Sequence, residues 1–65
     1  MQIVLNGEPF ATDARTVDEL CLSLGFAEAK IATAVNGAFV AAGRWPSTSL
    51  SPDDEVEIVA PRQGG

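Results

Sequence analysis

The clearest potential for chemistry lies at the carboxyl end of the chain, which closes with Gly64-Gly65. Glycine has no Cβ, so two terminal glycines adopt almost any backbone conformation and fit a narrow channel in another protein. The five residues Pro61 to Gly65 extend at most roughly 17 Å, enough to deliver a terminal carboxylate into a partner's active site. By itself this signal is not specific, because a frayed end, a cloning scar or a truncated chain would also leave two glycines.

A terminal carboxylate needs activation before it can transfer anything. Its negative charge disfavours nucleophilic attack, and oxide is a poor leaving group. Formation of an acyl-adenylate solves both problems. A sulfur nucleophile could then displace AMP and leave a terminal thiocarboxylate. The tail therefore indicates a carrier whose Gly65 carboxylate is the reacting group and whose Gly64 enters the partner's channel.

The side chains offer little alternative chemistry. The chain contains no histidine, so the commonest general base and metal ligand is missing. Its single cysteine, Cys21, provides neither a zinc site nor a Cys–His pair, and is best interpreted as a small buried hydrophobe. The acidic run Asp53-Asp54-Glu55 lacks the alternate ligands and central glycine of a calcium loop. We expect no metal site, no bound cofactor and no catalytic side chain.

Length, composition and charge also favour a carrier or binding module over an enzyme. A chain of 65 residues forms one domain at most, with a core that supplies about 3–5 kcal/mol of net stability. Hydrophobic residues make up 46% and charged residues 20%, which is the reverse of a disordered composition. The net charge is −5 and the four basic residues are scattered, so nucleic acid is a poor partner. An acidic face for a basic protein and a merely solvated surface both remain open.

The sequence also carries cues about compartment. One cysteine cannot form an internal disulfide, whereas small extracellular domains usually contain several. The N-terminus has no basic region followed by an apolar stretch, and no apolar run approaches the roughly 20 residues of a membrane helix. We therefore expect a cytoplasmic protein without a membrane partner.

The first elements to position the tail are a hairpin and a helix. Residues 2–5 form an apolar strand, Asn6-Gly7 favours a type I′ turn, and the chain returns through residues 9–12. Pro9 places this second strand at a sheet edge. A capping box then predicts a helix of about nine residues that ends at Gly25. Its N-cap is Thr16, its N3 residue is Glu19, and its apolar stripe consists of Val17, Leu20, Cys21 and Leu24.

The second half of the chain predicts short strands. Residues 32–35 form a strand, Asn36-Gly37 is a second hairpin signal, and the return begins at Phe39. Residues 41–52 are expected to be loop, in which Leu50 anchors into the core and Trp45 covers it. The alternation in residues 55–58 is typical of a half-buried last strand.

This order of elements predicts a β-grasp, an α+β fold in which one main helix packs on one face of a mixed sheet of about four to five strands. The last strand can lie parallel to the first because the intervening chain supplies the crossover. We place the domain at residues 1–60 and a flexible tail, ending in Gly-Gly, at residues 61–65.

Several segments along the whole chain together resemble the ThiS family, the ubiquitin-like sulfur carriers of thiamin (thiazole) biosynthesis. In chain order these segments are Met1–Gly7, Thr16–Leu20, Ala34–Gly37, Arg44-Trp45, Leu50, Asp53–Val59 and Gly64-Gly65. One departure is Asp53-Asp54, where family members commonly carry Gly-Asp. The departure lies in a structural turn and affects the functional expectation little.

The resemblance implies a defined sequence of partners. A ThiF-like adenylyltransferase would activate Gly65 with MgATP, so ATP and magnesium would bind the partner and not this chain. A cysteine desulfurase or another persulfide donor would supply the sulfur. Thiazole synthase (ThiG) would accept that sulfur from the Gly65 thiocarboxylate.

Strand alternation predicts a docking surface for these partners. We expect Val4 and Val59 to be neighbours on the sheet face that the helix leaves open, forming a small apolar patch near the tail, with Arg62 on the tail itself as a further contact. The alternative, that both are ordinary exposed valines, carries equal weight.

Three other functions remain open from the sequence. The small subunit of molybdopterin synthase shares the fold, the tail and the adenylation chemistry. A ubiquitin-like modifier would form isopeptide bonds to lysines instead. A plain interaction domain with an incidental Gly-Gly end would use neither chemistry.

Overall fold

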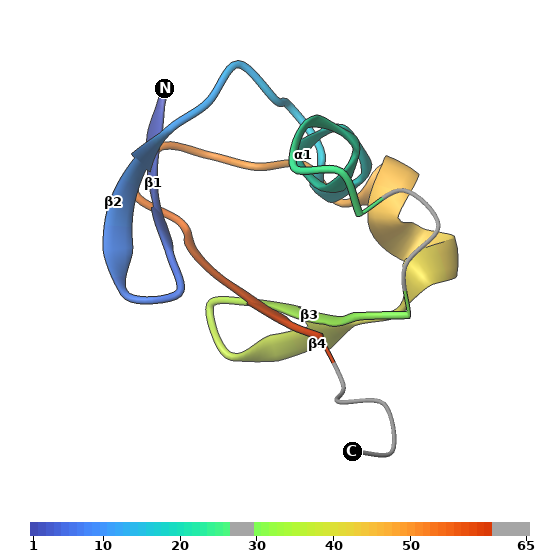
Figure 1. Ribbon diagram of the computed structural model, residues 1–65. Coiled ribbons are helices and arrows are strands. Elements are labelled where there is room, and N and C mark those ends of the chain that lie inside the picture. Colours follow the sequence, from blue (N-terminus) through green and yellow to red (C-terminus); the bar gives the residue numbers. More distant parts are fainter. Residues whose placement is uncertain (27–29, 61–65) are drawn as a thin grey trace.

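The computed structural model of the chain describes residues 1–26 and 30–60. In chain order its elements are β1 (Gln2–Leu5), β2 (Glu8–Ala11), α1 (Val17–Ser23), β3 (Ala32–Val35), β4 (Ala38–Val40), the 3-10 helix η1 (Ala42–Ser47) and β5 (Glu55–Val59). The five strands form one sheet, and α1 packs across one of its faces (Figure 1). The predicted α+β architecture is confirmed.

The sheet has the strand order β2-β1-β5-β3-β4. β5 is therefore central, and it pairs parallel with β1 and antiparallel with β3. β2 lies at an edge, as Pro9 predicts. Figure 1 shows the sheet bending around the helix, with the β1–β2 hairpin at the left, the β3–β4 hairpin along the bottom, and β5 running between them. Strands in sheets twist, so a sheet can curve around a short helix packed on one of its faces.

Both hairpins turn at Asn-Gly pairs with positive φ. The φ angles are 49° and 85° at Asn6 and Gly7, and 52° and 84° at Asn36 and Gly37. Type I′ turns need positive φ at both central residues, and asparagine and glycine tolerate it best. The two predicted hairpin turns are confirmed.

Helix α1 begins as the capping box predicts, but its reciprocal contact differs by one residue. Thr16 Oγ1 accepts from the Glu19 N–H at 3.1 Å. The Glu19 carboxylate accepts from the Arg15 N–H at 2.7 Å, whereas in a capping box the N3 carboxylate accepts from the N–H of the N-cap residue, here Thr16. The segment around Thr16 pairs instead with Ser49, because the Leu50 N–H donates to the Arg15 carbonyl and the Val17 N–H donates to the Thr48 carbonyl.

The helix is also shorter than expected, with seven residues and not nine. Leu24 serves as its C-cap and Gly25 follows with φ +83°. The Phe26 N–H donates to the Cys21 carbonyl and the Gly25 N–H to the Leu22 carbonyl, which is a Schellman motif. Gly25 therefore ends the helix as predicted, and Leu24 and Gly25 form the terminating turn.

The core lies between α1 and the sheet. Its buried apolar members are Ile3, Ala14, Val17, Leu20, Cys21, Trp45, Leu50, Val56 and Ile58. These residues confirm the predicted apolar stripe of the helix, the inward face of the last strand and the anchoring role of Leu50. Leu24, the last residue of the stripe, is half-buried and packs against this core.

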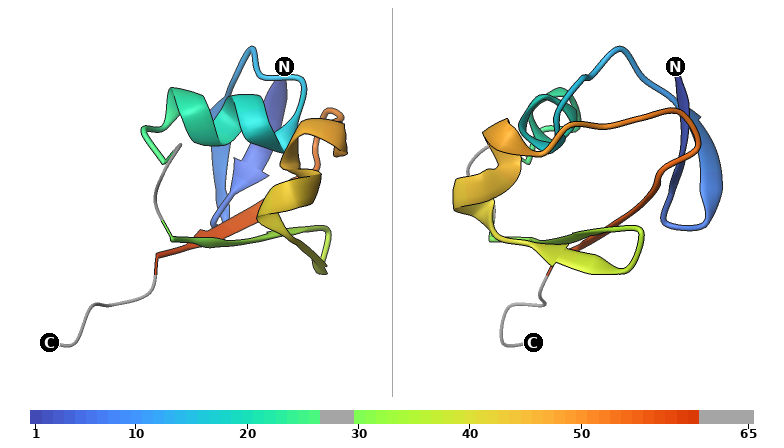
Figure 2. Two further views of the ribbon diagram at one scale, coloured as in Figure 1. Left: turned by 90° about the vertical axis from the view of Figure 1, so that its right-hand side faces the viewer. Right: turned by 180° about the vertical axis from the view of Figure 1, so that it is seen from behind.

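The segment predicted as loop contains a 3-10 helix, η1, which packs beside α1 (Figure 2). Trp45 lies buried within η1, and its indole Nε1–H donates to Thr33 Oγ1 at 2.9 Å and to the Val40 carbonyl at 3.2 Å. The Thr33 hydroxyl in turn donates to the same carbonyl at 2.8 Å. Thr33 is the buried polar residue of the described core, and this network satisfies it. Turn composition alone could not predict a helix held by one tryptophan.

We expect Trp45→Phe to lower the free energy of unfolding by about 1–3 kcal/mol, because it removes buried ring volume and the indole donor. That loss is a large share of the roughly 3–5 kcal/mol available to a domain of this size. Urea unfolding followed by circular dichroism measures it. Leu22→Ala, at an exposed helix position, is the control and should stay within about 0.5 kcal/mol of the parent. Equal midpoints for the two variants would contradict the role assigned to Trp45.

Candidate functional site

The residues predicted to carry the chemistry, Gly64 and Gly65, lie outside the described residues, and so does Arg62. The structure describes the frame that precedes them, which is β5 and the single residue Ala60 after it. Because β5 is the central strand, the tail follows directly from a strand that is paired on both sides. The frame therefore consists of β5 and its two neighbours, β1 and β3.

The side chains of β5 alternate cleanly between the two faces of the sheet. Val56 and Ile58 are buried against the core, whereas Glu55, Glu57 and Val59 are exposed. We call the face that carries the exposed set, opposite α1, the open face. Val59 is 62% exposed there, at the end of β5 from which the tail continues.

The predicted contact between Val4 and Val59 is wrong. Both side chains belong to the open face, since Val4 pairs with Glu55 in the parallel ladder. Val59, however, is four residues further along β5 and pairs with Ala32 of β3. At about 3.3 Å per residue the two valines are separated by about 13 Å along the strand. Alternation assigns a residue to a face, but it contains no information on register, and register decides which residues are neighbours.

Val59 lies beside β3, and β4 follows on the far side of β3. Ala32 of β3 lies opposite Val59. Ala34 of β3 lies between Glu57 of β5 on one side and Phe39 of β4 on the other. Phe39 is 72% exposed. We call Ala32, Ala34, Phe39 and Val59 the apolar corner. Phe39 and Val59 lie on either side of β3, with the two alanines between them, and together they form a surface that another protein could cover.

The sequence analysis did not identify Phe39 as a site residue. The available signal was the alternation in β4, where Val40 packs against the core and Phe39 must therefore point the other way. That signal becomes clear only when the face of Val40 is known.

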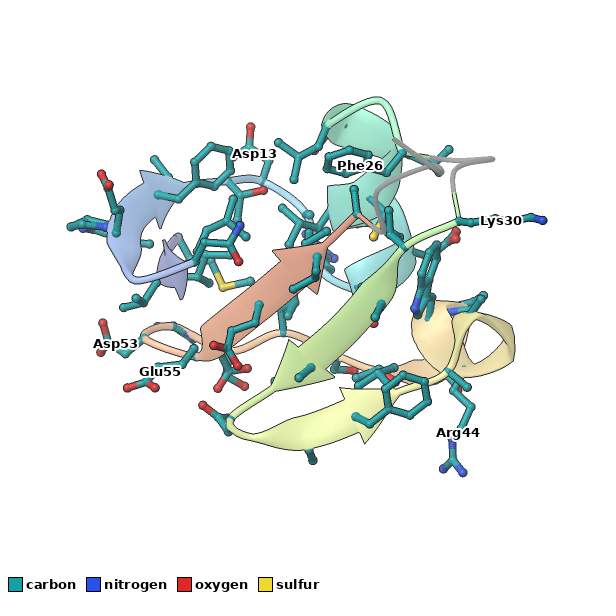
Figure 3. The ribbon with its side chains drawn as sticks, turned by 60° about the horizontal axis from the view of Figure 1, so that its bottom comes forward. Asp13, Phe26, Lys30, Arg44, Asp53 and Glu55 are labelled. Atoms are coloured by element: carbon teal, nitrogen blue, oxygen red, sulfur yellow. The ribbon has the colours of Figure 1, made fainter. Side chains whose placement is uncertain are left out.

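Charges on this side of the molecule are separated (Figure 3). Asp53 and Glu55 lie together at one end, whereas Arg44 and Lys30 lie at the opposite end. Glu57 is directly beside the apolar corner, in register with Ala34. The open face therefore combines an apolar corner with an acidic side, which suits a partner surface that carries basic residues around an apolar centre.

Cys21 has the environment of a structural cysteine. It is fully buried in the core. Burial, and secondly the negative charge of Asp18, raise the pKa of its thiol above the ordinary value of 9.0. A raised pKa lowers the thiolate fraction, and the thiolate is the nucleophilic form. Cys21 therefore contributes packing and is poorly suited to sulfur chemistry.

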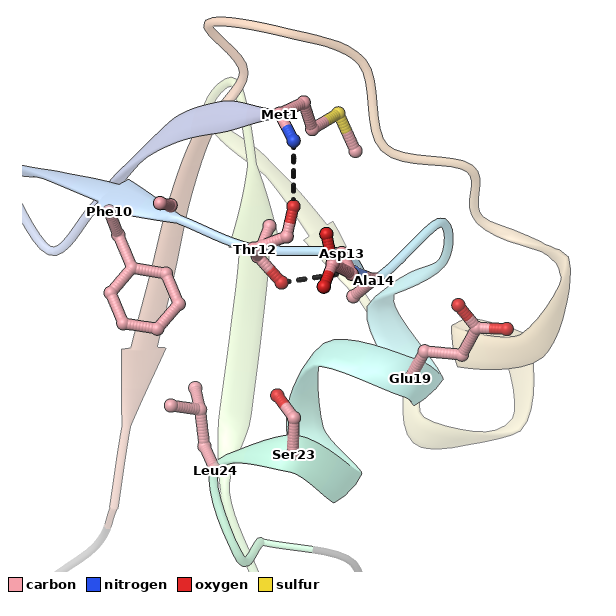
Figure 4. Close-up of a pocket in the computed structure, with 9 residues that line it drawn as sticks. Met1, Phe10, Thr12, Asp13, Ala14, Glu19, Ser23 and Leu24 are labelled. Atoms are coloured by element: carbon pink, nitrogen blue, oxygen red, sulfur yellow. Dashed lines mark hydrogen bonds between the residues drawn. The ribbon is translucent and has the colours of Figure 1, made fainter.

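A groove of about 600 Å³ lies on the helix side of the sheet (Figure 4). Its walls come from Met1, β2, the loop after β2, and α1. The Met1 ammonium group donates to the Thr12 carbonyl at 2.8 Å, and Thr12 Oγ1 accepts from the Ala14 N–H at 3.0 Å. Phe10 and Leu24, which line it, also pack against the core. The groove faces away from the open face and does not include the apolar corner.

The described part of the chain, residues 1–26 and 30–60, contains no group of three histidine, cysteine or acidic side chains placed to hold a metal ion.

No helix among the described residues is both long enough and apolar enough to span a membrane.

Comparison with known families decides between the carriers that share this fold. The sequence profile of the ThiS family matches residues 3–65, which is nearly the whole chain and includes Gly64-Gly65. The chain belongs to the ThiS family. ThiS proteins are the sulfur carriers of thiamin thiazole biosynthesis, so the family favours this pathway over molybdenum cofactor synthesis.

Solved structures of ThiS proteins have the same fold. The crystal structure of the thiamine biosynthesis protein ThiS from Geobacter metallireducens superposes with a TM-score of 0.81, at 29% identity and with full coverage of both chains. A solution structure of a thiamine biosynthesis protein from the same organism gives a TM-score of 0.81 at 26% identity, covering this whole chain and 88% of that one. The β-grasp prediction is confirmed.

A longer relative connects the family to the synthase. A thiazole synthase from Magnetococcus marinus is 42% identical over 60 residues, which is 91% of this chain. Our chain spans only 18% of that protein's length. One polypeptide named thiazole synthase therefore contains a region similar to ThiS.

We expect the Cys21 thiol of the folded protein to react with iodoacetamide roughly 100-fold or more slowly than that of urea-unfolded protein, because reaction requires opening a domain of about 3–5 kcal/mol. Intact mass against time measures labelling. Rapid labelling of the folded state would contradict the assignment of Cys21 as a packing residue.

Proposed function

We propose that this protein carries sulfur for thiazole formation on the carboxylate of Gly65 and catalyses no reaction itself. The observation that supports this most directly is the match of the ThiS family to residues 3–65, which extends through the terminal glycines. The burial of Cys21, the one thiol, agrees with a carrier that works through its backbone terminus.

The proposed chemistry has three steps. The Gly65 carboxylate attacks the α-phosphorus of MgATP on a ThiF-like adenylyltransferase, pyrophosphate leaves, and an acyl-adenylate forms. The terminal sulfur of a persulfide, supplied by a cysteine desulfurase or another donor, attacks the acyl carbon and AMP leaves. Cleavage of the resulting S–S bond by a second thiol releases the Gly65 thiocarboxylate. ATP and magnesium belong to the activating partner throughout, and this chain needs no cofactor.

Thiazole synthase is the proposed acceptor. Support comes from the Magnetococcus marinus thiazole synthase, in which a region similar to this chain occurs within a longer protein. Placement of carrier-like and synthase sequences in one polypeptide is expected when the two must meet, because covalent linkage raises their effective concentration. We further propose that the protein acts in the cytoplasm, where a thiocarboxylate and a single reduced cysteine are compatible with the surroundings.

The apolar corner is the proposed docking site for the activating enzyme. Phe39 and Val59 are exposed, and Val59 is the last residue of β5. A partner that covers these side chains holds the carrier beside the start of the tail, within the roughly 17 Å that five residues can reach. This replaces the Val4–Val59 patch with one that follows the observed register. Arg62, on the tail, remains a proposed additional contact.

The first test is the intact mass of the 65-residue chain after incubation with adenylyltransferase, ATP, desulfurase and cysteine. We expect a gain equal to the replacement of one oxygen by sulfur. Deletion of Gly65, or addition of one residue after it, should abolish the gain, because the activated carboxylate is then absent or misplaced. Cys21→Ser should retain it. No gain with demonstrably active enzymes, or its loss in Cys21→Ser alone, would refute the carrier chemistry.

The second test concerns docking. Phe39→Ser should raise the KM for the carrier in the adenylation reaction by about tenfold to a hundredfold, because burial of an aromatic side chain contributes about 1.5–3 kcal/mol. Stability should change little, since Phe39 is 72% exposed in the free protein. Leu22→Ser, at an exposed position of α1, is the matched control and should leave KM unchanged. Equal KM values in the two variants would exclude the apolar corner as the docking site.

A further inference from the structure

The side chain of Asn6 makes the pair of hydrogen bonds to β5 that two residues of a continuing parallel strand would make. Asn6 Oδ1 accepts from the Ile58 N–H at 2.8 Å, and Asn6 Nδ2 donates to the Ile58 carbonyl at 3.2 Å. The two residues are 52 positions apart in the sequence. A side-chain amide has the same donor and acceptor types as a peptide group. Asn6 therefore extends the pairing of β1 with β5 by one step.

The Asn6 side chain is needed for this pairing because β1 is short. Its ladder with β5 consists of Val4 opposite Glu55 and Leu5 opposite Val56, followed by the Asn6 N–H donating to the Val56 carbonyl at 2.9 Å. On its other side β5 pairs with β3 as far as Val59. Among the described residues, the Asn6 amide supplies both hydrogen-bond partners of the Ile58 peptide groups on the β1 side. Without it, these partly buried groups would lose their protein partners.

Asn36 makes a similar pair of side-chain hydrogen bonds at the other end of β5. We call each such pair of asparagine hydrogen bonds a clamp. Asn36 Oδ1 accepts from the Glu55 N–H at 3.0 Å, and Asn36 Nδ2 donates to Asp54 Oδ1 at 3.0 Å. Both asparagines occupy the first position of an Asn-Gly turn, with φ of 49° and 52°. The two clamps thus have the same turn geometry, and they differ in which end of β5 they hold.

We propose that Asn6 is a positioning residue for the carrier tail. Its amide holds Ile58, from which only Val59 and Ala60 lead to residues 61–65. A clamped Ile58 fixes where the tail begins and keeps Val59 opposite Ala32 in the apolar corner. When a partner is docked on that corner, the tail begins at a fixed position relative to the partner's active site. Less conformational entropy is then lost when Gly65 reaches that site. The proposal rests on the carrier function proposed above.

The turn conformation and the clamp can be separated by substitution. Glycine adopts positive φ without strain, so Asn6→Gly retains the turn and removes only the amide. Asn36→Gly is the matched control, because it makes the same change at the opposite end of β5. If Asn6→Gly fails to fold, Asn6→Asp tolerates the same backbone conformation and removes the donor to the Ile58 carbonyl.

The experiment compares the wild-type 65-residue chain with the two glycine variants. Amide hydrogen exchange at Ile58 is measured at a temperature where all three chains are folded. Steady-state AMP release by the ThiF-like adenylyltransferase is measured at the same temperature, with ATP, desulfurase and cysteine present so that the acyl-adenylate turns over. In Asn6→Gly we expect the Ile58 N–H to exchange about 5- to 30-fold faster. We expect kcat to fall, by up to the roughly 100-fold that misplacement of a reacting group can cause, with KM retained. Asn36→Gly should accelerate exchange at Glu55 and keep kcat.

Each other result has a definite meaning. Equal kcat values in the two variants, whether lowered or unchanged, would overturn the positioning role and leave Asn6 a structural residue. A raised KM with retained kcat would also overturn it, since Asn6 would then act on docking. Failure of the wild-type chain to be adenylated would refute the carrier function itself, and the proposal with it, and is distinguished from the other results by occurring before any substitution.

Discussion

The parallel pairing of β1 with β5 is the constraint on which the rest of the structure depends. Two strands from opposite ends of the chain lie side by side, and parallel neighbours cannot be joined by a tight turn. The chain between them must cross the sheet, and α1 makes this crossing while it buries its apolar stripe. The same pairing places β5 in the centre, where it is held from both sides. The strand that leads to the tail is thus paired on both sides.

The small size of the domain explains why single side chains carry structural tasks that larger proteins spread over many residues. Trp45 joins η1 to β3 and β4 through one buried indole donor. Asn6 extends the hydrogen bonding of β1, a strand of only four residues, beyond its carboxyl end. In both cases a side chain supplies hydrogen bonds that additional main chain would otherwise provide. A domain with about 3–5 kcal/mol of net stability cannot leave such groups unpaired.

The division of the molecule into two faces separates stability from recognition. The helix side contains the core, the buried thiol of Cys21 and a groove bordered by β2 and α1. The open face presents the apolar corner beside acidic side chains such as Glu57. A carrier must be recognised by an activating enzyme and by an acceptor. A face that does not contribute to the core can vary in sequence to fit both partners without loss of stability. The membership of the chain in the ThiS family fits this separation.

The sequence by itself determined the strands, the helix α1 and their order, and it led to the proposal that Gly65 is the reacting group. Asn-Gly turns, the Thr16 cap and the alternation of β5 are local patterns, and each expresses a short-range preference of the backbone or of one face. Only the tertiary structure decided register and long-range partners. The separation of Val4 from Val59, the helix around Trp45 and the clamp from Asn6 to Ile58 all depend on which distant residues come together. Side-chain periodicity repeats every two residues and leaves strand offset undetermined, so these contacts are settled by packing of the whole core.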